Sequence, residues 1–233
     1  MNIRHCWLTL LFCLLLSVPM NADDSLRDSL KNATLRLSFH PDSIELRLAK
    51  ASWNMQLEQW EYAKDEYDYI LTRQPHNLAA LYFRAYANER LHRYHFARLD
   101  YEDVLTVVPG HFEARLGLAL LNEKDKHFTA ALDGLNLLVE QHPDSALAWG
   151  ARAGVERERG MVEAALYDLT EALKRSPNNK EWLLARADLY LQTNCYDDAR
   201  RDLEKLVALG VSKPSLSPFF RRLKQRKNKK LIK

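Results

Sequence analysis

The sequence has few cysteines, and only one outside its first two dozen residues. Of its three cysteines, Cys6 and Cys13 lie in a segment with the features of a secretory signal. Residues 1–22 have a basic residue, Arg4, near their start, continue through an apolar run and end at Ala22, the expected cleavage site. Removal of this segment would leave Cys195 as the single cysteine. The exported chain could then form no internal disulfide and must be stabilised by packing.

Long apolar stretches are also missing. The run from Cys6 to Val18 is 13 residues long, whereas a membrane-spanning helix needs about 20, and no later segment approaches that length. We therefore predict an exported chain, with an uncleaved N-terminal anchor as the alternative. Export without disulfides is more typical of a bacterial periplasm than of a eukaryotic secretory path, where disulfide-rich domains are common.

Motifs for catalysis and cofactor binding are absent from the sequence. It contains no HExxH, no CxxC, no Gly-rich phosphate loop and no Gly-x-Ser-x-Gly elbow. Glu89, His92 and His95 form an ExxHxxH run, but it straddles a predicted turn and does not place the ligands on one helix face. The sequence therefore predicts a noncatalytic protein with no cofactor and no metal, with an enzyme or a metal protein as the alternative.

Acidic residues are absent from the C-terminal end. Residues 213–233 contain nine Lys or Arg and no Asp or Glu. Without these nine and Arg4, 24 basic residues remain against 31 acidic ones, a formal charge of −7 for residues 23–212. The basic tail has no aromatic residue after Phe220, so stacking on nucleic-acid bases is not predicted. Contact with anionic lipid or an acidic protein is the alternative to a solvated end.

What the sequence does contain is a period of 34 residues. Two sets of alanines, one set of prolines and two sets of large residues recur at this spacing. The sets are Ala51, Ala85, Ala119, Ala153 and Ala187; Ala63, Ala97, Ala131, Ala165 and Ala199; Pro41, Pro75, Pro109, Pro143 and Pro177; Trp60, Tyr94, Phe128, Val162 and Tyr196; and Tyr67, Tyr101, Leu135, Leu169 and Leu203. A fixed period of this length is typical of a repeat solenoid.

These small, large and proline positions resemble the tetratricopeptide repeat, a helix–turn–helix unit. The resemblance covers residues 44–213 and implies an all-α, right-handed superhelical solenoid of antiparallel helix pairs, a fold that usually binds a protein or peptide partner. The expected repeats are 44–77, 78–111, 112–145, 146–179 and 180–213. Residues 23–43 are expected to form a capping helix, the second half of a degenerate repeat. Residues 214–233 are expected to form a C-terminal capping helix followed by the basic tail.

Charged residues follow the same period. Counting each repeat from its first residue, basic residues at position 7 precede acidic residues at position 23 by sixteen residues. The four pairs are Lys50 and Glu66, Arg84 and Asp100, Arg152 and Asp168, and Arg186 and Asp202. The third repeat has Leu118 and Gly134 instead. This joint loss indicates that the two positions touch and form structural ion pairs, with ligand contacts as the alternative.

Three asparagines, Asn54, Asn88 and Asn122, also recur at the period. We expect their side chains to bond the backbone of an adjacent helix, a structural role.

The resemblance implies that positions 2, 5, 9, 12 and 13 of the first helices line a concave binding groove, and the candidates come from positions 5, 9 and 12. The candidate groove residues are Leu48, Tyr82, Tyr86, Glu89, Leu116, Leu120, Glu123, Gly150, Gly154, Arg157 and Asp188. Tyr82 and Tyr86 are candidate anchors, with packing inside the solenoid as the alternative. Each of the two glycines costs about 1 kcal/mol in a helix relative to alanine. We therefore expect a neighbouring side chain, such as Tyr86 or Trp182, or a ligand backbone to approach them.

Overall fold

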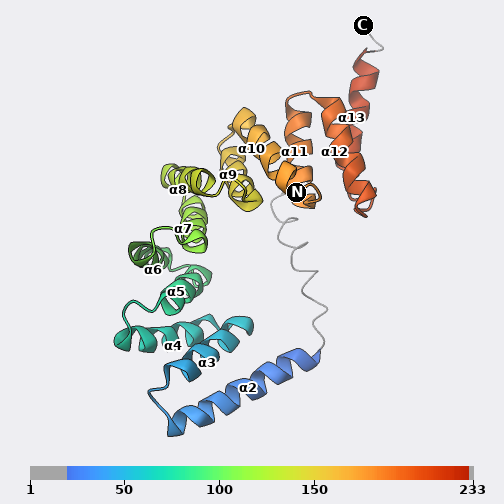
Figure 1. Cartoon of the computed structure of the whole chain (residues 1–233). Helices are drawn as coiled ribbons and strands as arrows, with labels where there is room; N and C mark the ends of the chain where they lie inside the picture. The colour runs from blue at the N-terminus through green and yellow to red at the C-terminus, as the bar shows by residue number, and fades with distance from the viewer. Residues whose placement is uncertain (1–19, 231–233) are drawn as a thin grey trace. The chain divides into compact units, whose positions relative to one another are not determined.

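The computed structural model describes residues 20–230, with side chains from residue 24 to residue 223, and this part of the chain consists of α-helices joined by short turns (Figure 1). Its twelve helices are α2 (Met20–Phe39), α3 (Ile44–Gln56), α4 (Trp60–Arg73), α5 (Leu78–Arg90), α6 (Tyr94–Val107), α7 (Phe112–Lys124), α8 (Phe128–Gln141), α9 (Ala146–Glu158), α10 (Val162–Arg175), α11 (Lys180–Gln192), α12 (Tyr196–Ala208) and α13 (Ser217–Lys230). The predicted all-α class is confirmed. The predicted signal segment lies outside the described residues, except that Met20 to Ala22 form the start of α2.

The helices pack with their neighbours in the chain, as expected for a stack of helix pairs. The chain divides into two compact bodies, with the boundary between His111 and Phe112. In the N-terminal body α2 packs on α3, α3 on α4, α4 on α5 and α5 on α6. In the C-terminal body the same order continues from α7 to α12, and α13 packs on both α11 and α12.

The first helix of most repeats begins at a capping side chain. Ser43, Asn77, Ser145 and Asn179 each accept a hydrogen bond from the amide three residues later, at 3.0–3.4 Å. Such caps satisfy amides that have no partner within the helix. The second helices end two residues before the recurring prolines, for example at Arg73 before Pro75. Proline cannot donate a backbone hydrogen bond, so it prevents the helix from continuing.

The turn inside each repeat uses a left-handed residue at position 15. The five residues are Glu58, His92, Lys126, Gly160 and Asn194, with φ between 56° and 70°. In the second repeat the amide of Arg93 donates to the carbonyl of Asn88 at 2.8 Å, closing the end of α5. Glycine and asparagine, here Gly160 and Asn194, adopt this conformation readily. The other three residues adopt it although a side chain makes it unfavourable.

The recurring alanines lie at the centres of the helix contacts. All ten are at most 1% exposed, and the large residues at position 24, from Tyr67 to Leu203, are at most 2% exposed. A methyl group at each crossing lets neighbouring helices approach closely. Because the interior is filled, extra bulk at these sites should cost about 1–3 kcal/mol through overpacking.

The last helix extends the repeat register beyond the fifth repeat. Leu216 and Leu223 are buried, and Phe219 and Phe220 pack against the core of α11 and α12. Arg222 lies 34 residues after Asp188 and donates to it at 2.6 Å. The described start of α13 therefore takes the place of the first helix of an incomplete sixth repeat.

Candidate functional site

The recurring charges form ion pairs within the repeats. Arg84 Nη2 lies 2.6 Å from Asp100 Oδ1, and Arg84 Nε lies 3.0 Å from the second oxygen. Arg152 with Asp168 and Arg186 with Asp202 repeat this two-pronged geometry at 2.6–2.9 Å. In the first repeat Lys50 Nζ lies 2.6 Å from Glu66, which Arg47 also contacts at 2.7 Å. The structure thus brings together all four predicted pairs.

We call these four ion pairs the ladder. Its three arginines, Arg84, Arg152 and Arg186, each also reach the second helix of the preceding repeat. Arg84 Nη1 donates to Asp68 at 2.8 Å. The matching atom of Arg152 donates to Asn136 at 3.0 Å, and that of Arg186 donates to Thr170 at 3.2 Å. The three acceptors stand at position 25 of their repeats. The guanidinium therefore joins two successive second helices, which the sequence did not predict because the acceptor type changes from repeat to repeat.

Burial disfavours the charged forms of the side chains in the ladder. Asp100 is 3% exposed, and burial raises its pKa although Arg84 and Asn88 act in the opposite direction. Burial lowers the pKa of Arg84, but the hydrogen bonds and negative charges of Asp100 and Asp68 together outweigh it, so the pKa of Arg84 is also raised. A buried pair of this kind contributes little net stability, but removing one partner leaves an uncompensated charge.

The recurring asparagines do not behave as expected. Asn88 Nδ2 donates to the side chain of Asp100 at 3.3 Å, not to the backbone, and Asn54 Nδ2 is buried without a hydrogen-bond partner. The expectation of side-chain to backbone bonds is therefore wrong for these two residues. For Asn88 the reason is its position beside the buried carboxylate of Asp100, which is a stronger acceptor than a carbonyl already used by its helix.

The two candidate tyrosines of α5, Tyr82 and Tyr86, have different surroundings. The Tyr82 ring lies 5.9 Å from the rings of both Tyr101 and His111, so this half-buried residue packs inside the body. Tyr86 is 37% exposed, and its ring forms a T-shaped contact with the Trp60 ring, with 5.9 Å between the ring centroids. Tyr86 is thus the available anchor of the two.

Other first-helix positions of the N-terminal body are less open. Leu48 and Glu89 are half-buried. Phe83 is 43% exposed and stacks on Tyr67 at 6.2 Å. It was not predicted as a surface residue, because it lies outside positions 5, 9 and 12.

In the C-terminal body the corresponding face is mixed. Leu120 is 39% exposed, Leu116 is half-buried and Arg157 is exposed. Glu123 is half-buried, and its pKa is raised by that burial and by Glu158, with Arg157 acting in the opposite direction. Asp188 pairs with Arg222 of α13. These side chains offer both signs of charge beside an apolar residue.

The two glycines of α9 have different surroundings. A Cβ added to Gly150 would lie 2.4 Å from two carbons of the Trp182 ring, so this tryptophan fills the space, as one of the two alternatives predicted. A Cβ added to Gly154 would meet no atom within 4 Å. Gly150 is therefore required by packing inside the body, whereas Gly154 leaves open space on the first-helix face.

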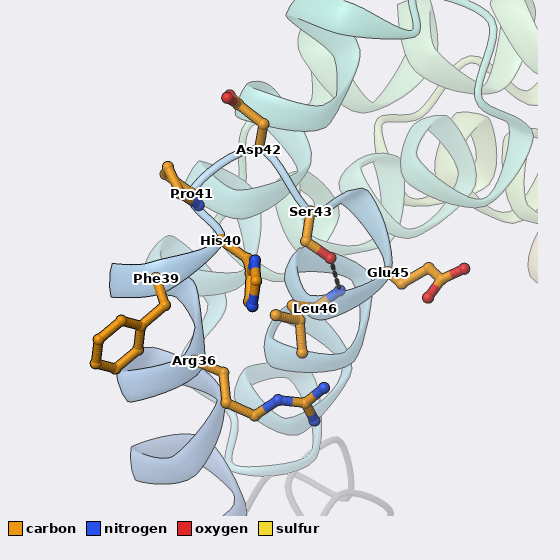
Figure 2. Close-up of a pocket in the computed structure, with 8 residues that line it drawn as sticks. All are labelled: Arg36, Phe39, His40, Pro41, Asp42, Ser43, Glu45 and Leu46. Carbon is orange, nitrogen blue, oxygen red and sulfur yellow. Dashed lines mark hydrogen bonds between the residues drawn. The ribbon is translucent and has the colours of Figure 1, made fainter.

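Two surface cavities of about 490 Å³ lie away from the predicted groove positions. The first lies at the junction of α2 and α3, and its lining is formed by Arg36, Phe39, His40, Pro41, Asp42, Ser43, Glu45 and Leu46. Figure 2 shows Ser43 directed at the amide of Leu46 and the Phe39 ring pointing away from them. Phe39 is 72% exposed.

The second cavity lies over the ladder, between α4, α5 and α6. It is lined by Lys64, Asp68, Arg84, Asn88, Arg93, Phe96, Leu99, Asp100 and Asp103. Lys64 donates to Asp68 at 2.7 Å, and Phe96 and Leu99 are exposed. Several charged side chains that border this cavity are thus already paired with one another within the N-terminal body.

The histidine run does not assemble a metal centre. His92 has a left-handed backbone, and its Nδ1 lies 3.0 Å from the Tyr94 hydroxyl, while His95 is exposed beside Phe96. Within the described residues, no group of three His, Cys, Asp or Glu side chains is arranged to hold a metal ion. Among those same residues, no helix has both the length and the apolarity needed to cross a membrane.

Comparison with known families and structures gives consistent matches. Models of the tetratricopeptide repeat match residues 90–146, 127–180 and 156–211, which together span residues 90–211. No curated protein sequence matches this chain significantly.

Several solved structures share the fold. A tetratricopeptide repeat protein from Parabacteroides merdae is 23% identical, with a TM-score of 0.64 over 87% of this chain and 79% of its own. MamA (residues 41 to the end) from Desulfovibrio magneticus is 18% identical, with a TM-score of 0.65 over 72% and 96%. YrrB, described as a repeat protein with an unusual peptide-binding site, is 17% identical, with a TM-score of 0.62 over 82% and 97%.

Proposed function

The chain belongs to the tetratricopeptide repeat family, and we propose that it is a noncatalytic scaffold that binds a protein or peptide on the exposed side chains of its first helices. One observation carries this proposal. The charges that recur with the period have partners in the ladder, whereas the first helices leave side chains such as Tyr86, Leu120 and Arg157 exposed. These residue types do not recur from repeat to repeat, so packing of the repeats does not account for them.

The chemistry of this face fits an extended peptide or a partner helix. An exposed tyrosine supplies a large, rigid contact area and a hydroxyl, a combination that is frequent at the energetic centres of interfaces. In the C-terminal body, the open space at Gly154 lies on the same helix as the exposed Arg157. A peptide backbone can approach a glycine closely, and an arginine can pair with a carboxylate. The peptide-binding site described for YrrB supports the same mode of action.

The test is cross-linking capture from native extract with tagged full-length protein. Tyr86→Ala is compared with Tyr62→Ala, a matched control because Tyr62 is 66% exposed but lies on a second helix. We expect the wild type and Tyr62→Ala to capture the same partner, and Tyr86→Ala to lose it with unchanged circular dichroism and unfolding. Equal capture by both variants would contradict binding at Tyr86.

A membrane-peripheral assembly factor is the second candidate, and it rests on α13. The described start of this helix packs on α11 and α12, while its last seven residues, 224–230, include five Lys or Arg. A cluster of this size favours an anionic lipid surface, at about 1 kcal/mol for each basic residue near the membrane. Deletion of residues 224–233 should then abolish sedimentation with anionic vesicles. Unchanged sedimentation would remove this candidate.

We also propose that the protein is exported, on the basis of residues 1–22, and acts in a bacterial periplasm. Fractionation of cells that express the tagged full-length chain tests this location. Recovery of the tag in the cytosolic fraction would contradict it.

A further inference from the structure

The fourth repeat has an acidic residue at position 11, where the first three repeats have an amide. The first three repeats have asparagine there, and Asn88 shows its role by donating to the ladder acid Asp100. The fourth repeat has Glu156, which is only 6% exposed. A carboxylate cannot donate a hydrogen bond, so an ionised Glu156 could not replace the amide of asparagine.

The surroundings of Glu156 contain more acid than base. Its Oε1 lies 3.9 Å from Arg152 Nε, and its Oε2 is buried without a hydrogen-bond partner. Both oxygens of Asp168 already accept from Arg152, at 2.6 and 2.9 Å. Two buried carboxyl groups therefore share one guanidinium, which cannot compensate two negative charges at the same time.

The helices packed against α9 and α10 bring no second cation to this cluster among the described contacts. From α8 the group that reaches Arg152 is the neutral amide of Asn136. From α7, Glu123 interacts with Glu158 and Arg157. From α11, Arg186 is bound to Thr170 and to Asp202 of α12. The charges that act on Glu156 are thus those of Arg152 and Asp168.

We propose that Glu156 is held as the neutral acid, that its proton takes the place of the asparagine amide hydrogen beside Asp168, and that the cohesion of α9 with α10 is consequently controlled by pH. Loss of this proton places two carboxylates on one guanidinium. The repulsion then weakens the contact between Arg152 and Asp168, which links the two helices beside their apolar core. This inference concerns the stability of one helix pair and does not depend on the proposed binding function.

The direction of the pH dependence follows from the same contacts. Burial, followed by the charge of Asp168, raises the pKa of Glu156 to about 7, with Arg152 acting in the opposite direction. In the unfolded chain the group has its ordinary pKa of 4.5. Glu156 therefore keeps a proton in the folded α9–α10 helix pair and releases it when the pair opens. The stabilisation of the helix pair is complete below the unfolded-state pKa of 4.5 and is lost as pH rises through the folded-state pKa of about 7.

The test is native-state hydrogen exchange of the α9 and α10 amides in the full-length chain. Wild type and Glu156→Gln are compared at each pH, so that intrinsic exchange rates cancel. Glutamine can donate at every pH. We expect the opening constant of the wild type, relative to this variant, to rise roughly tenfold per pH unit between about pH 5 and 7. Glu163→Gln, at an exposed site of α10, is the matched control and should give a ratio that does not change with pH.

A second measurement tests the proton itself. The infrared spectrum of the folded wild type at pH 6 is compared with that of Glu156→Gln. The difference between the two spectra should contain the carbonyl band of a protonated carboxyl group. A pH-independent opening ratio, or a spectrum at pH 6 without that band, would overturn the proposal.

Discussion

The helix pairs α5–α6 and α7–α8 have the same dimensions but different chemistry between the helices. Each pair has a first helix of 13 residues and a second of 14. Between α5 and α6 lie Arg84 and Asp100, whereas α7 and α8 have Leu118 and Gly134 at these positions. A Cβ on Gly134 would lie 3.4 Å from the Ala119 methyl group, a normal packing distance.

This comparison shows that the ion pair does not set the geometry of a repeat. The buried alanines and the left-handed turn residues are common to both pairs, and they suffice to place the helices. The ion pair adds a link through Arg84 to Asp68 on the preceding second helix. It is therefore a connection between successive repeats, built on a scaffold that can form without it.

The largest expected effect comes from breaking the pair on one side. Arg84→Leu leaves Asp100 buried with the neutral amide of Asn88 as its hydrogen-bond donor and no paired cation, and should lower the free energy of unfolding by about 3–5 kcal/mol. Urea titration of the full-length chain measures this. Arg93→Leu is the matched control, because Arg93 pairs with Glu61 at the surface, where such a pair contributes at most about 1 kcal/mol. Equal losses would show that Asp100 is not sensitive to its partner.

The two glycines of α9 allow a comparison within a single helix, because one site is filled by a neighbouring side chain and the other is open. Gly150→Ala should destabilise the protein by about 1–3 kcal/mol, because its methyl group would overlap the Trp182 ring. Gly154→Ala should stabilise it by up to about 1 kcal/mol, because the site is open and alanine favours the helix. Thermal unfolding of both variants measures the difference. Shifts of the same sign would show that the two sites are not distinct.

The smallest expected effect tests a feature that the two helix pairs share. His92 and Lys126 occupy the left-handed turn position of their repeats, with φ of 59° and 64°. His92→Gly and Lys126→Gly should each stabilise the protein by about 1 kcal/mol, since glycine adopts this conformation without a steric cost. Gains of similar size are expected by urea titration, because the turns are equivalent. A gain in only one would mean that the turns differ in strain.

The sequence predicted the helices well because the 34-residue period repeats the same physical constraint five times. A single alanine in a helix carries little information, but five alanines at one spacing indicate a shared contact. The joint loss of Arg and Asp at Leu118 and Gly134 predicted the ion pair for the same reason. Contacts that vary between repeats had no such signal, and the arginine bonds to Asp68, Asn136 and Thr170 were missed.

The candidate site was predicted less well because neighbouring residues on one face have different surroundings. Tyr82 and Tyr86 lie four residues apart on α5, and the sequence cannot show that the rings of Tyr101 and His111 cover only the first. Gly150 and Gly154 are separated by the same spacing, and only one faces Trp182. Exposure at these positions depends on side chains from other helices, which periodicity does not specify.

The central claim is that the recurring charges are structural partners of one another and are not ligand contacts. A double-mutant cycle with Arg84→Leu, Asp100→Gly and the double variant, which reproduces the third repeat, measures this most directly by urea unfolding. We predict that the double variant is more stable than either single variant, because removing both charges leaves neither one buried alone. A double variant destabilised by the sum of the single losses would contradict the claim.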